Sequence, residues 1–568
     1  MNQIELNYTR WMNSKKLPAE VKKQIRLMNQ KDVDDAFFTD LTFGTAGMRG
    51  ILGWGTNRLN IFTLRKACVG FAKYVLKCVD NAKIRGVVIA RDNRHMGLEF
   101  QEECVKVLNA YGIKVFVFPS LRPTPELSFA VRYFGAAGGI MLTASHNPKE
   151  YNGFKVYDEY GCQLVPVKVN KLIDIISDLP SELEVTLPKI KGNVREEIGS
   201  RIDTDYLELV KLIQLKPELN KENFRIVFTP QHGTSYVNAM RLFEELGYDV
   251  YPVLSQIDPD PNFSGTLSPN PEDPRSFIEA IKLAKEVKAH LIVMTDPDGD
   301  RVGLAYRNIK DEYILVNGNV SAAILLDYVL RTKKDRGSLH QNSVVYNTIV
   351  SSEIGQKICE YYGVKHNAFL TGFKYIGEEI QRQLECGGPT FVFGYEESYG
   401  CLLAPFVRDK DGIQAILMYC EMALNYHLSG LYLDDAYHII QEKVGFYSDS
   451  SYSIEFKGPK GAVEMDSIMK RLQQNPLKQV GIRMVRTYED YGNSIGYDFV
   501  NNTTYPLLLE KSDVIRIRFT DDCYLAIRPS GTEPKCKFYI GICAKKQNDV
   551  LSKDIELFDE LKKSLDII

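Results

Sequence analysis

The sequence lacks the features that mark several large classes of protein. Its 70 Lys and Arg residues stand against 73 Asp and Glu residues, so the net charge of −3 leaves none of the basic excess that nucleic-acid binding requires. No apolar run reaches the length of a membrane-spanning helix, and the first residues show no basic-then-apolar leader pattern. We therefore expect a cytoplasmic protein that binds no nucleic acid and no membrane. No obligate protein partner is implied.

The sequence also lacks paired cysteines. Its eleven cysteines are spread along the chain without a CxxC pair, and their number is odd. This distribution favours reduced thiols over a disulfide framework, which agrees with a cytoplasmic location. Low-complexity stretches are missing as well, whereas a hydrophobic content of 44% and a charged content of 25% are ordinary for a globular protein.

What the sequence does contain is a repeated alternation of apolar strands with helical segments. The run 86–90 ends at the polar segment Arg91-Asp92-Asn93-Arg94, and later runs at 138–142, 291–294 and 391–393 also end in polar motifs. Such runs favour mainly parallel sheets that helices cover on both faces, with ligands at the carboxyl ends of the strands. From about residue 446 the pattern changes to strands at 514–519 and 524–527 and a closing amphipathic helix.

A chain of 568 residues exceeds a single core and divides into several domains. We predict an α/β fold with three related mixed α/β domains and a smaller C-terminal α+β domain that has an antiparallel sheet. The predicted boundaries give four domains: 1–205, 206–320, 321–445 and 446–568.

Three aspartates at alternate positions follow the run 291–294. In an extended loop, Asp296, Asp298 and Asp300 would point the same way and converge on one ion. All-oxygen ligation by carboxylates suits Mg²⁺. An EF-hand is excluded because Arg301 stands where that loop has its turn glycine. The alternative is a solvated acidic turn, but its charges would repel one another without a cation, so the pattern favours a metal loop.

A serine stands in the polar segment TASHNP after the run 138–142. Ser145 offers a hydroxyl nucleophile, which needs a proton acceptor and charge neutralisation nearby. His146 and Lys155 are the candidates. The alternatives are a turn or helix cap for the serine and a satisfied turn histidine for His146. Together with the aspartate loop, this serine indicates phosphoryl transfer through a phosphoserine.

The segment 528–535, RPSGTEPK, has the composition of a phosphate clamp. Arg528 and Lys535 supply cationic donors. Ser530 and Thr532 supply hydroxyls, and Gly531 lets backbone N–H groups approach an anion. A polar turn between two strands is the alternative, and the density of donors favours the clamp.

Two further segments carry weaker signals. In the glycine-rich segment 43–50, Arg49 is either exposed to a phosphate or part of a flexible turn. In the segment 395–400, Glu396 and Ser398 either accept from and donate to sugar hydroxyls or cap the following element. Neither segment would support a function alone.

These motifs, in this order, resemble those of the α-D-phosphohexomutase superfamily. The resemblance covers essentially the whole chain and is greatest to the phosphoglucomutase/phosphopentomutase branch. It implies four domains around a central cleft, each contributing one loop. The predicted domains would then be a phosphoserine domain (1–205), a metal-binding domain (206–320), a sugar-binding domain (321–445) and a phosphate-binding domain (446–568).

The resemblance also implies a role for each candidate residue. Ser145 would carry a phosphoryl group in the resting enzyme. Asp296, Asp298 and Asp300 would hold Mg²⁺ together with an oxygen of that phosphoserine, and Arg301 would support the loop. The other implied roles are contacts to the reacting oxygens (Arg49, His146, Lys155 and Lys374, with Lys155 or Lys374 assisting proton transfer), to the sugar hydroxyls (Glu396 and Ser398), and to the phosphate that is not being transferred (Arg528, Ser530, Gly531, Thr532 and Lys535).

The activity that the resemblance implies is the interconversion of the hexose phosphates glucose 1-phosphate and glucose 6-phosphate, with glucose 1,6-bisphosphate as intermediate and activator. Ser398 favours glucose because pentomutase-like relatives carry Ala there, whereas Tyr395 resembles the aromatic residue of the pentose branch. The alternatives are a phosphopentomutase, a sugar-bisphosphate synthase and, less favoured, a non-catalytic sugar-phosphate-binding paralogue.

Overall fold

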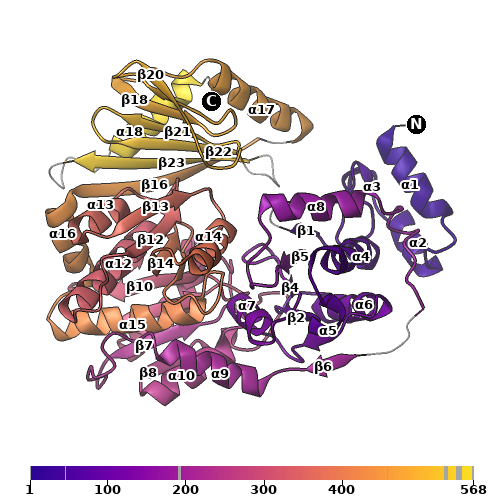
Figure 1. Cartoon of the computed structure of the whole chain (residues 1–568), viewed down its shortest axis with the longest axis horizontal. Coiled ribbons are helices and arrows are strands. Elements are labelled where there is room, and N and C mark those ends of the chain that lie inside the picture. Colours follow the sequence, from indigo (N-terminus) through magenta and orange to yellow (C-terminus); the bar gives the residue numbers. More distant parts are fainter. Residues whose placement is uncertain are drawn as a thin grey trace. The chain divides into compact units, whose positions relative to one another are not determined.

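A computed structural model of the chain describes residues 2–44, 47–189, 194–456, 458–529, 535–544 and 553–565 (Figure 1). Contacts divide the chain into two compact units. The first comprises Met1–Asn317, Phe373–Phe393 and Ser398–Tyr432, and the second comprises Gly318–Gly372, Gly394–Glu397 and Leu433–Ile568. Within the described ranges, no helix has both the length and the apolar character needed to span a membrane.

The first sheet of the first unit has the strand order β1-β5-β4-β2-β3-β6. Its strands are β1 (Met48–Ile51), β2 (Val87–Arg91), β3 (Val115–Val117), β4 (Gly138–Leu142), β5 (Tyr151–Tyr157) and β6 (Arg195–Glu197). The pairs β2–β3, β2–β4 and β3–β6 are parallel, whereas β5 runs antiparallel to both β4 and β1. The antiparallel return of β5 places the chain after the Ser145 turn back alongside β4.

Helices cover this sheet because its central strands are mainly apolar, and β3 and β4 are buried throughout. Helix α4 (Ile61–Cys78) packs against α6 (Gly97–Ala110) and α8 (Pro166–Ser177), and α7 (Thr124–Tyr133) packs against β2 and β4. The short α5 is Ala82–Arg85. Before them, α1 (Gln3–Asn13), α2 (Ala19–Arg26) and α3 (Gln30–Phe37) gather around the buried Trp11, whose indole N–H donates to Glu182 at 2.5 Å.

The second sheet of the first unit has the order β11-β10-β9-β7-β8. Its strands are β7 (Arg225–Thr229), β8 (Asp249–Pro252), β9 (Leu291–Thr295), β10 (Val302–Arg307) and β11 (Tyr313–Val316). The pairs β7–β8 and β7–β9 are parallel, and β10 runs antiparallel to β9 and β11. The helical segments around it are α9 (Ser200–Lys211), α10 (Tyr236–Leu246), η1 (Leu254–Gln256), η2 (Pro274–Phe277) and α11 (Ile278–Val287). Helix α15 (Gly412–Leu428), much later in the chain, packs on β9 and β10.

The second unit contains the parallel pair β12 (Ser343–Thr348) and β13 (Lys365–Phe369), with α12 (Gly318–Asp335) packed against α13 (Ile354–Tyr362) and α16 (Leu433–Val444). Strand β14 (Thr390–Glu396) begins in the first unit and ends in the second, whereas α14 (Phe373–Cys386) and β15 (Gly400–Leu402) belong to the first.

The C-terminal part of the second unit is an antiparallel sheet in the order β16-β23-β22-β21-β18-β19-β20. Its strands are β16 (Phe446–Glu455), β18 (Arg483–Asp490), β19 (Ile495–Asp498), β20 (Thr503–Pro506), β21 (Ile515–Phe519), β22 (Tyr524–Pro529) and β23 (Lys535–Ala544), with β17 (Gln479–Val480) paired to β18. The helices are α17 (Gly458–Gln474) and α18 (Lys553–Ser564). The predicted α/β fold with a smaller C-terminal α+β domain is confirmed, while the domain boundaries stay predictions.

Candidate active site

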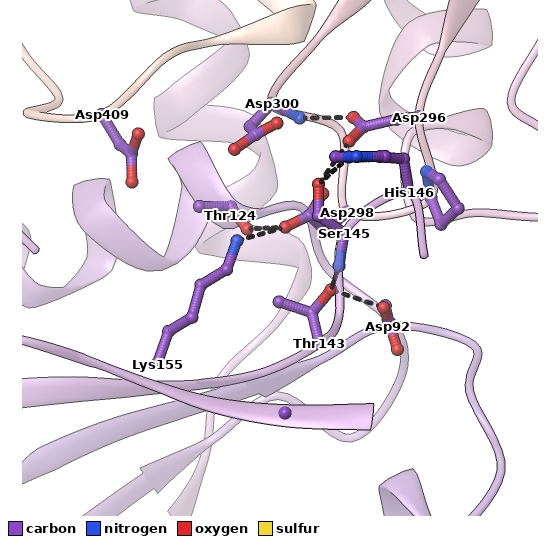
Figure 2. Close-up of polar contacts among 12 residues, drawn as sticks. Asp92, Thr124, Thr143, Ser145, His146, Lys155, Asp296, Asp298, Asp300 and Asp409 are labelled. Carbon is purple, nitrogen blue, oxygen red and sulfur yellow. Dashed lines mark hydrogen bonds and ion pairs between the residues drawn. The ribbon is translucent and has the colours of Figure 1, made fainter. Parts of the chain in front are cut away.

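Ser145 lies in a tight turn directly after β4, with a left-handed backbone (φ +52°) that is costly for a residue other than glycine. Its side chain is only 3% exposed. The hydroxyl Oγ lies 2.9 Å from Asp296 Oδ2 and 3.2 Å from His146 Nδ1 (Figure 2). The nucleophile predicted from the sequence is therefore buried against the aspartate loop, with a histidine at its side.

The aspartate loop follows β9 and is a turn rather than the extended segment that we expected. Asp296 Oδ1 accepts the backbone N–H of Asp300 at 3.1 Å and that of Arg301 at 3.0 Å, and Gly299 has a left-handed φ of +69°. The alternation argument was thus wrong in its geometry. The turn nevertheless brings one ligand atom from each of Asp296, Asp298 and Asp300 within 4.8 Å of one another.

Electrostatics make this cluster suited to a cation. Burial raises the pKa of Asp296 well above its usual range, and the neighbouring Asp298 and Asp300 add to the effect. Burial also opposes ionisation of Asp298, but the Lys155 ammonium 2.8 Å from its Oδ2 overcomes that cost and lowers its pKa. Two buried oxygens, Oδ1 of Asp298 and of Asp300, accept no hydrogen bond within the described part of the chain. Buried carboxylate oxygens in such a cluster fit a hard divalent cation such as Mg²⁺.

Lys410 is a member of this cluster that sequence reasoning missed. Its Nζ lies 3.1 Å from Asp300 Oδ2 and 3.5 Å from Asp409 Oδ1, and Asp409 Oδ2 accepts the hydroxyl of Tyr157 at 2.9 Å. Lys410 lies one residue before Asp411, the N-cap of α15, and this helix packs on β9 and β10. The available signal was a run of alternating charges, Arg408 to Asp411, directly before a strongly apolar segment.

The remaining predicted cations of the first unit differ in their surroundings. Arg49, on β1, donates to Asn147 Oδ1 at 2.6 Å, and burial lowers its pKa. Arg301 donates to Glu272 Oε1 at 3.0 Å and lies 3.8 Å from Asp300 Oδ1, a position that supports the loop. Lys374 is buried at the start of α14, 5.1 Å from the ring centre of Tyr375, and its place beside the reacting oxygens stays a prediction.

In the second unit, Glu396 accepts the N–H of Gly372 at 2.7 Å. The next residue, Glu397, which sequence reasoning did not select, accepts the hydroxyl of Thr348 at 2.8 Å, and burial followed by the charge of Glu396 raises its pKa. Ser398 belongs to the first unit and is half-buried.

Arg528, the first residue of the predicted phosphate clamp, lies on β22 and pairs with Lys537 of β23 in the sheet register. Lys535 begins β23 and lies 4.0 Å from Glu455 Oε1. Ser530, Gly531 and Thr532 lie outside the described residues. Their grip on a phosphate therefore stays a prediction.

The turn 230–234, which follows β7, contacts and supports the aspartate loop. The N–H of Thr234 donates to the carbonyl of Pro297 at 2.9 Å, and its hydroxyl donates to the same oxygen at 3.1 Å. A Cβ on Gly233 would collide with that carbonyl. Only glycine therefore allows this approach between the two loops.

We expect Gly233→Ala to displace the aspartate loop and to lower Mg²⁺ affinity and activity by about 10- to 100-fold, the usual cost of disturbing groups that orient metal ligands. Isothermal titration with Mg²⁺ and initial rates would measure both effects. Ser177→Ala is the control, because it removes an exposed hydroxyl that bonds the carbonyl of Asp174 in its own helix. Equal Mg²⁺ affinity in the two variants would contradict the supporting role.

Comparisons with known proteins define the class of this chain. Three domain families match it in order: phosphoglucomutase/phosphomannomutase, alpha/beta/alpha domain I over residues 40–182, domain II over 204–310 and domain III over 317–438. These domains, together with the β-rich C-terminal domain, define an intramolecular phosphotransferase of the isomerase class. The chain belongs to the phosphoglucomutase/phosphomannomutase family, within the α-D-phosphohexomutase superfamily.

The similarity to individual relatives extends over most of the chain. A phosphoglucomutase from Staphylococcus aureus (strain bovine RF122 / ET3-1) is 37% identical over 522 residues, which cover 91% of this chain and 92% of that protein. A phosphoglucomutase from Staphylococcus epidermidis (strain ATCC 12228 / FDA PCI 1200) is 37% identical over 525 residues, or 90% and 94% of the two chains.

Solved structures show the same fold. A phosphoglucomutase/phosphomannomutase family protein from Burkholderia thailandensis superposes with a TM-score of 0.67 at 18% identity, covering 93% of this chain and 98% of that one. The open form of pp63/parafusin from Paramecium gives a TM-score of 0.67 at 19% identity, with 93% and 95% covered.

Proposed function

We propose that this protein is a Mg²⁺-dependent phosphoglucomutase that interconverts α-D-glucose 1-phosphate and glucose 6-phosphate through a phosphorylated Ser145. The observation that carries the proposal is the buried Ser145 hydroxyl, 2.9 Å from Asp296 in a cluster of three aspartates. The 37% identity with relatives named phosphoglucomutase supports the choice of reaction.

The proposed reaction has two phosphoryl transfers. In the first, the bond between phosphorus and Ser145 Oγ breaks as a bond forms to the free hydroxyl oxygen of the hexose monophosphate. The proton of that hydroxyl passes to a nearby base, and Oγ takes up a proton. The product is glucose 1,6-bisphosphate. In the second transfer, the other phosphate of this intermediate passes to Ser145 Oγ, which gives up its proton, and the freed sugar oxygen takes up a proton. Glucose 1,6-bisphosphate would therefore also act as an activator, because it rephosphorylates an empty Ser145.

Phosphoryl transfer depends on positioning and on charge neutralisation, so the charged side chains around Ser145 have assigned roles in the proposal. Asp296, Asp298 and Asp300, with an oxygen of phosphorylated Ser145, would hold Mg²⁺, which supplies positive charge to the phosphoryl oxygens when bound. The contacts of Lys155 with Asp298 and of Lys410 with Asp300 place two further cations at the cluster.

Proton transfer and substrate binding have their own proposed residues. His146, whose Nδ1 lies 3.2 Å from Ser145 Oγ, is suited to exchange a proton with that oxygen. The other proposed roles are charge neutralisation or proton transfer (Arg49, Lys155 and Lys374), support of the aspartate loop (Arg301), binding of the sugar hydroxyls (Glu396 and Ser398), and binding of the phosphate that is not being transferred (Arg528, Ser530, Gly531, Thr532 and Lys535).

The proposal favours glucose over pentose phosphates. Tyr395, the residue that resembles the pentose branch, is 1% exposed, and its hydroxyl accepts from Asn347 at 3.0 Å. Because this hydroxyl already bonds Asn347, the proposal treats Tyr395 as a structural support and not as a sugar contact. Ser398, in contrast, is accessible enough to bond a hydroxyl.

We expect the protein to turn over glucose 1-phosphate at least about tenfold faster than ribose 1-phosphate, and Ser398→Ala to reduce kcat/KM for glucose 1-phosphate by about tenfold, the value of one hydrogen bond. Coupled assays with both substrates would test this, with the exposed Ser429→Ala as a control away from the loop. A preference for ribose 1-phosphate would favour a phosphopentomutase. Net accumulation of glucose 1,6-bisphosphate would favour a sugar-bisphosphate synthase.

The proposal also includes a cytoplasmic location. All eleven cysteines are free thiols, and eight of them are buried. Free thiols in this number are typical of a reducing compartment. Hexose phosphate is the only partner that the proposed function requires.

A further inference from the structure

Arg94, in the polar segment after β2, is fully enclosed beneath the Ser145 turn. Its two terminal nitrogens donate to four backbone carbonyls: Nη2 to Ser145 at 2.6 Å and Asn147 at 2.5 Å, and Nη1 to Pro148 and Tyr151, both at 2.8 Å. The guanidinium thus bonds the nucleophile's own carbonyl and three carbonyls of the segment that follows. Burial lowers the pKa of Arg94, so its contacts have to offset a large desolvation cost.

Asp92 contacts both Arg94 and Thr143. Its Oδ2 lies 3.2 Å from Arg94 Nε and accepts the hydroxyl of Thr143 at 2.6 Å, and its Oδ1 accepts the backbone N–H of Arg94 at 3.1 Å. The hydroxyl oxygen of Thr143 in turn accepts the backbone N–H of Ser145 at 2.8 Å (Figure 2). One buried carboxylate therefore anchors both side chains that bond the backbone of Ser145.

The contacts from Thr143 and Arg94 act on the strained backbone conformation of Ser145. With the N–H of Ser145 held by Thr143 and its carbonyl held by Arg94, both peptide groups that flank its φ and ψ angles are fixed. A φ of +52° is unfavourable for serine and persists only where the surroundings impose it. The direction of Oγ depends on that backbone conformation.

We propose that Asp92, Arg94 and Thr143 form a positioning cradle that holds Ser145 in its left-handed conformation and so places Oγ for phosphoryl transfer. The inference rests on the proposed function, since it assigns these residues to the same nucleophile. None of the three is a catalytic residue. Each acts through the backbone of Ser145.

The cradle depends on the shape of the guanidinium more than on its charge. Lysine at position 94 would keep the positive charge but could not bond four carbonyls in two directions. Thr143→Ser keeps the oxygen that accepts from Ser145, whereas Thr143→Val keeps the shape and removes that oxygen. Comparing Arg94 with lysine separates positioning from charge. Comparing Thr143→Ser with Thr143→Val separates positioning from packing.

For Arg94→Lys and Thr143→Val we expect kcat for glucose 1-phosphate to fall about 100-fold, the cost of misplacing a reacting atom by about 1 Å, with KM within about threefold of wild type. Thr143→Ser should retain kcat within about threefold. Hydrogen exchange of the peptide 143–151, followed by mass spectrometry, should be faster in Arg94→Lys and Thr143→Val than in wild type and Thr143→Ser.

The control is Arg85→Lys, because Arg85 also bonds two backbone carbonyls and a carboxylate, those of Gly135, Ala136 and Glu159, away from Ser145. It should leave kcat and exchange of 143–151 unchanged. If Arg94→Lys does not fold, the Thr143 pair decides. Equal kcat in Thr143→Val and Thr143→Ser would overturn the cradle. If wild type shows no mutase activity, the proposed function fails, and equal hydrogen exchange in the Thr143 pair would then overturn the cradle independently.

Discussion

Replacing Ser145 with alanine will abolish the interconversion of glucose 1-phosphate and glucose 6-phosphate, with a loss of about 10⁴-fold or more, and leave the protein without a covalent phosphoryl group. The loss is this large because Oγ is the atom that accepts and returns the phosphoryl group in the proposed reaction. Removing it leaves the aspartate cluster and the cradle in place. Thermal unfolding should therefore change little, whereas Mg²⁺ binding should weaken, because the phosphoserine oxygen is missing from the proposed ligands.

The matched control is Ser177→Ala, which removes an exposed serine whose hydroxyl bonds the carbonyl of Asp174. It should retain full activity in the same coupled assay. Mutase activity in Ser145→Ala at the level of the control would refute the covalent role of Ser145. Loss of activity together with a marked fall in the unfolding temperature would point instead to a collapse of the Ser145 turn and the aspartate loop.

Replacing Asp298 with asparagine will reduce activity by about 10³-fold and weaken Mg²⁺ binding. Asp298 Oδ2 accepts from both Lys155, at 2.8 Å, and Thr124, at 3.1 Å, while its Oδ1 is a buried acceptor suited to the cation. The neutral amide removes one negative charge from the proposed metal site. It also leaves the Lys155 ammonium without its ionised partner, which should destabilise the fold by about 3 kcal/mol.

Isothermal titration with Mg²⁺, initial rates and thermal unfolding would measure the three effects of Asp298→Asn. The control is Asp311→Asn, which removes an exposed carboxylate 3.7 Å from Arg307 in a surface turn. It should leave all three unchanged, because exposed ion pairs contribute little. Undiminished activity of wild type after exhaustive chelation would contradict the metal role of the cluster.

Sequence patterns predicted the parts of this structure that are local. The apolar runs 86–90, 138–142 and 291–294 became β2, β4 and β9 within one residue, because strands buried on both faces leave a continuous apolar signal. Each predicted motif also lies where its strand ends. The convergence of the three aspartates was predicted for the wrong reason, since the left-handed Gly299 folds the loop into a turn.

The parts that could not be predicted depend on contacts between distant residues. The carbonyl of Ser145, whose backbone is left-handed, is bonded by Arg94, 51 residues earlier. The segment TASHNP alone does not predict that conformation. Lys410 reaches Asp300 because α15 packs on β9 and β10, a pairing that no local pattern contains. The helices α1–α3 were not predicted, because the cluster around Trp11 includes Phe62 and Leu183 from far along the chain.

The measurement that tests the account most directly is the intact mass of the purified protein before and after incubation with glucose 6-phosphate. We predict an adduct of one phosphoryl group before incubation, localised to Ser145 by fragmentation, with that group transferred to the sugar afterwards. Ser145→Ala should carry no adduct under either condition. A wild-type protein that never carries phosphate at Ser145, yet interconverts the two glucose phosphates, would contradict the account.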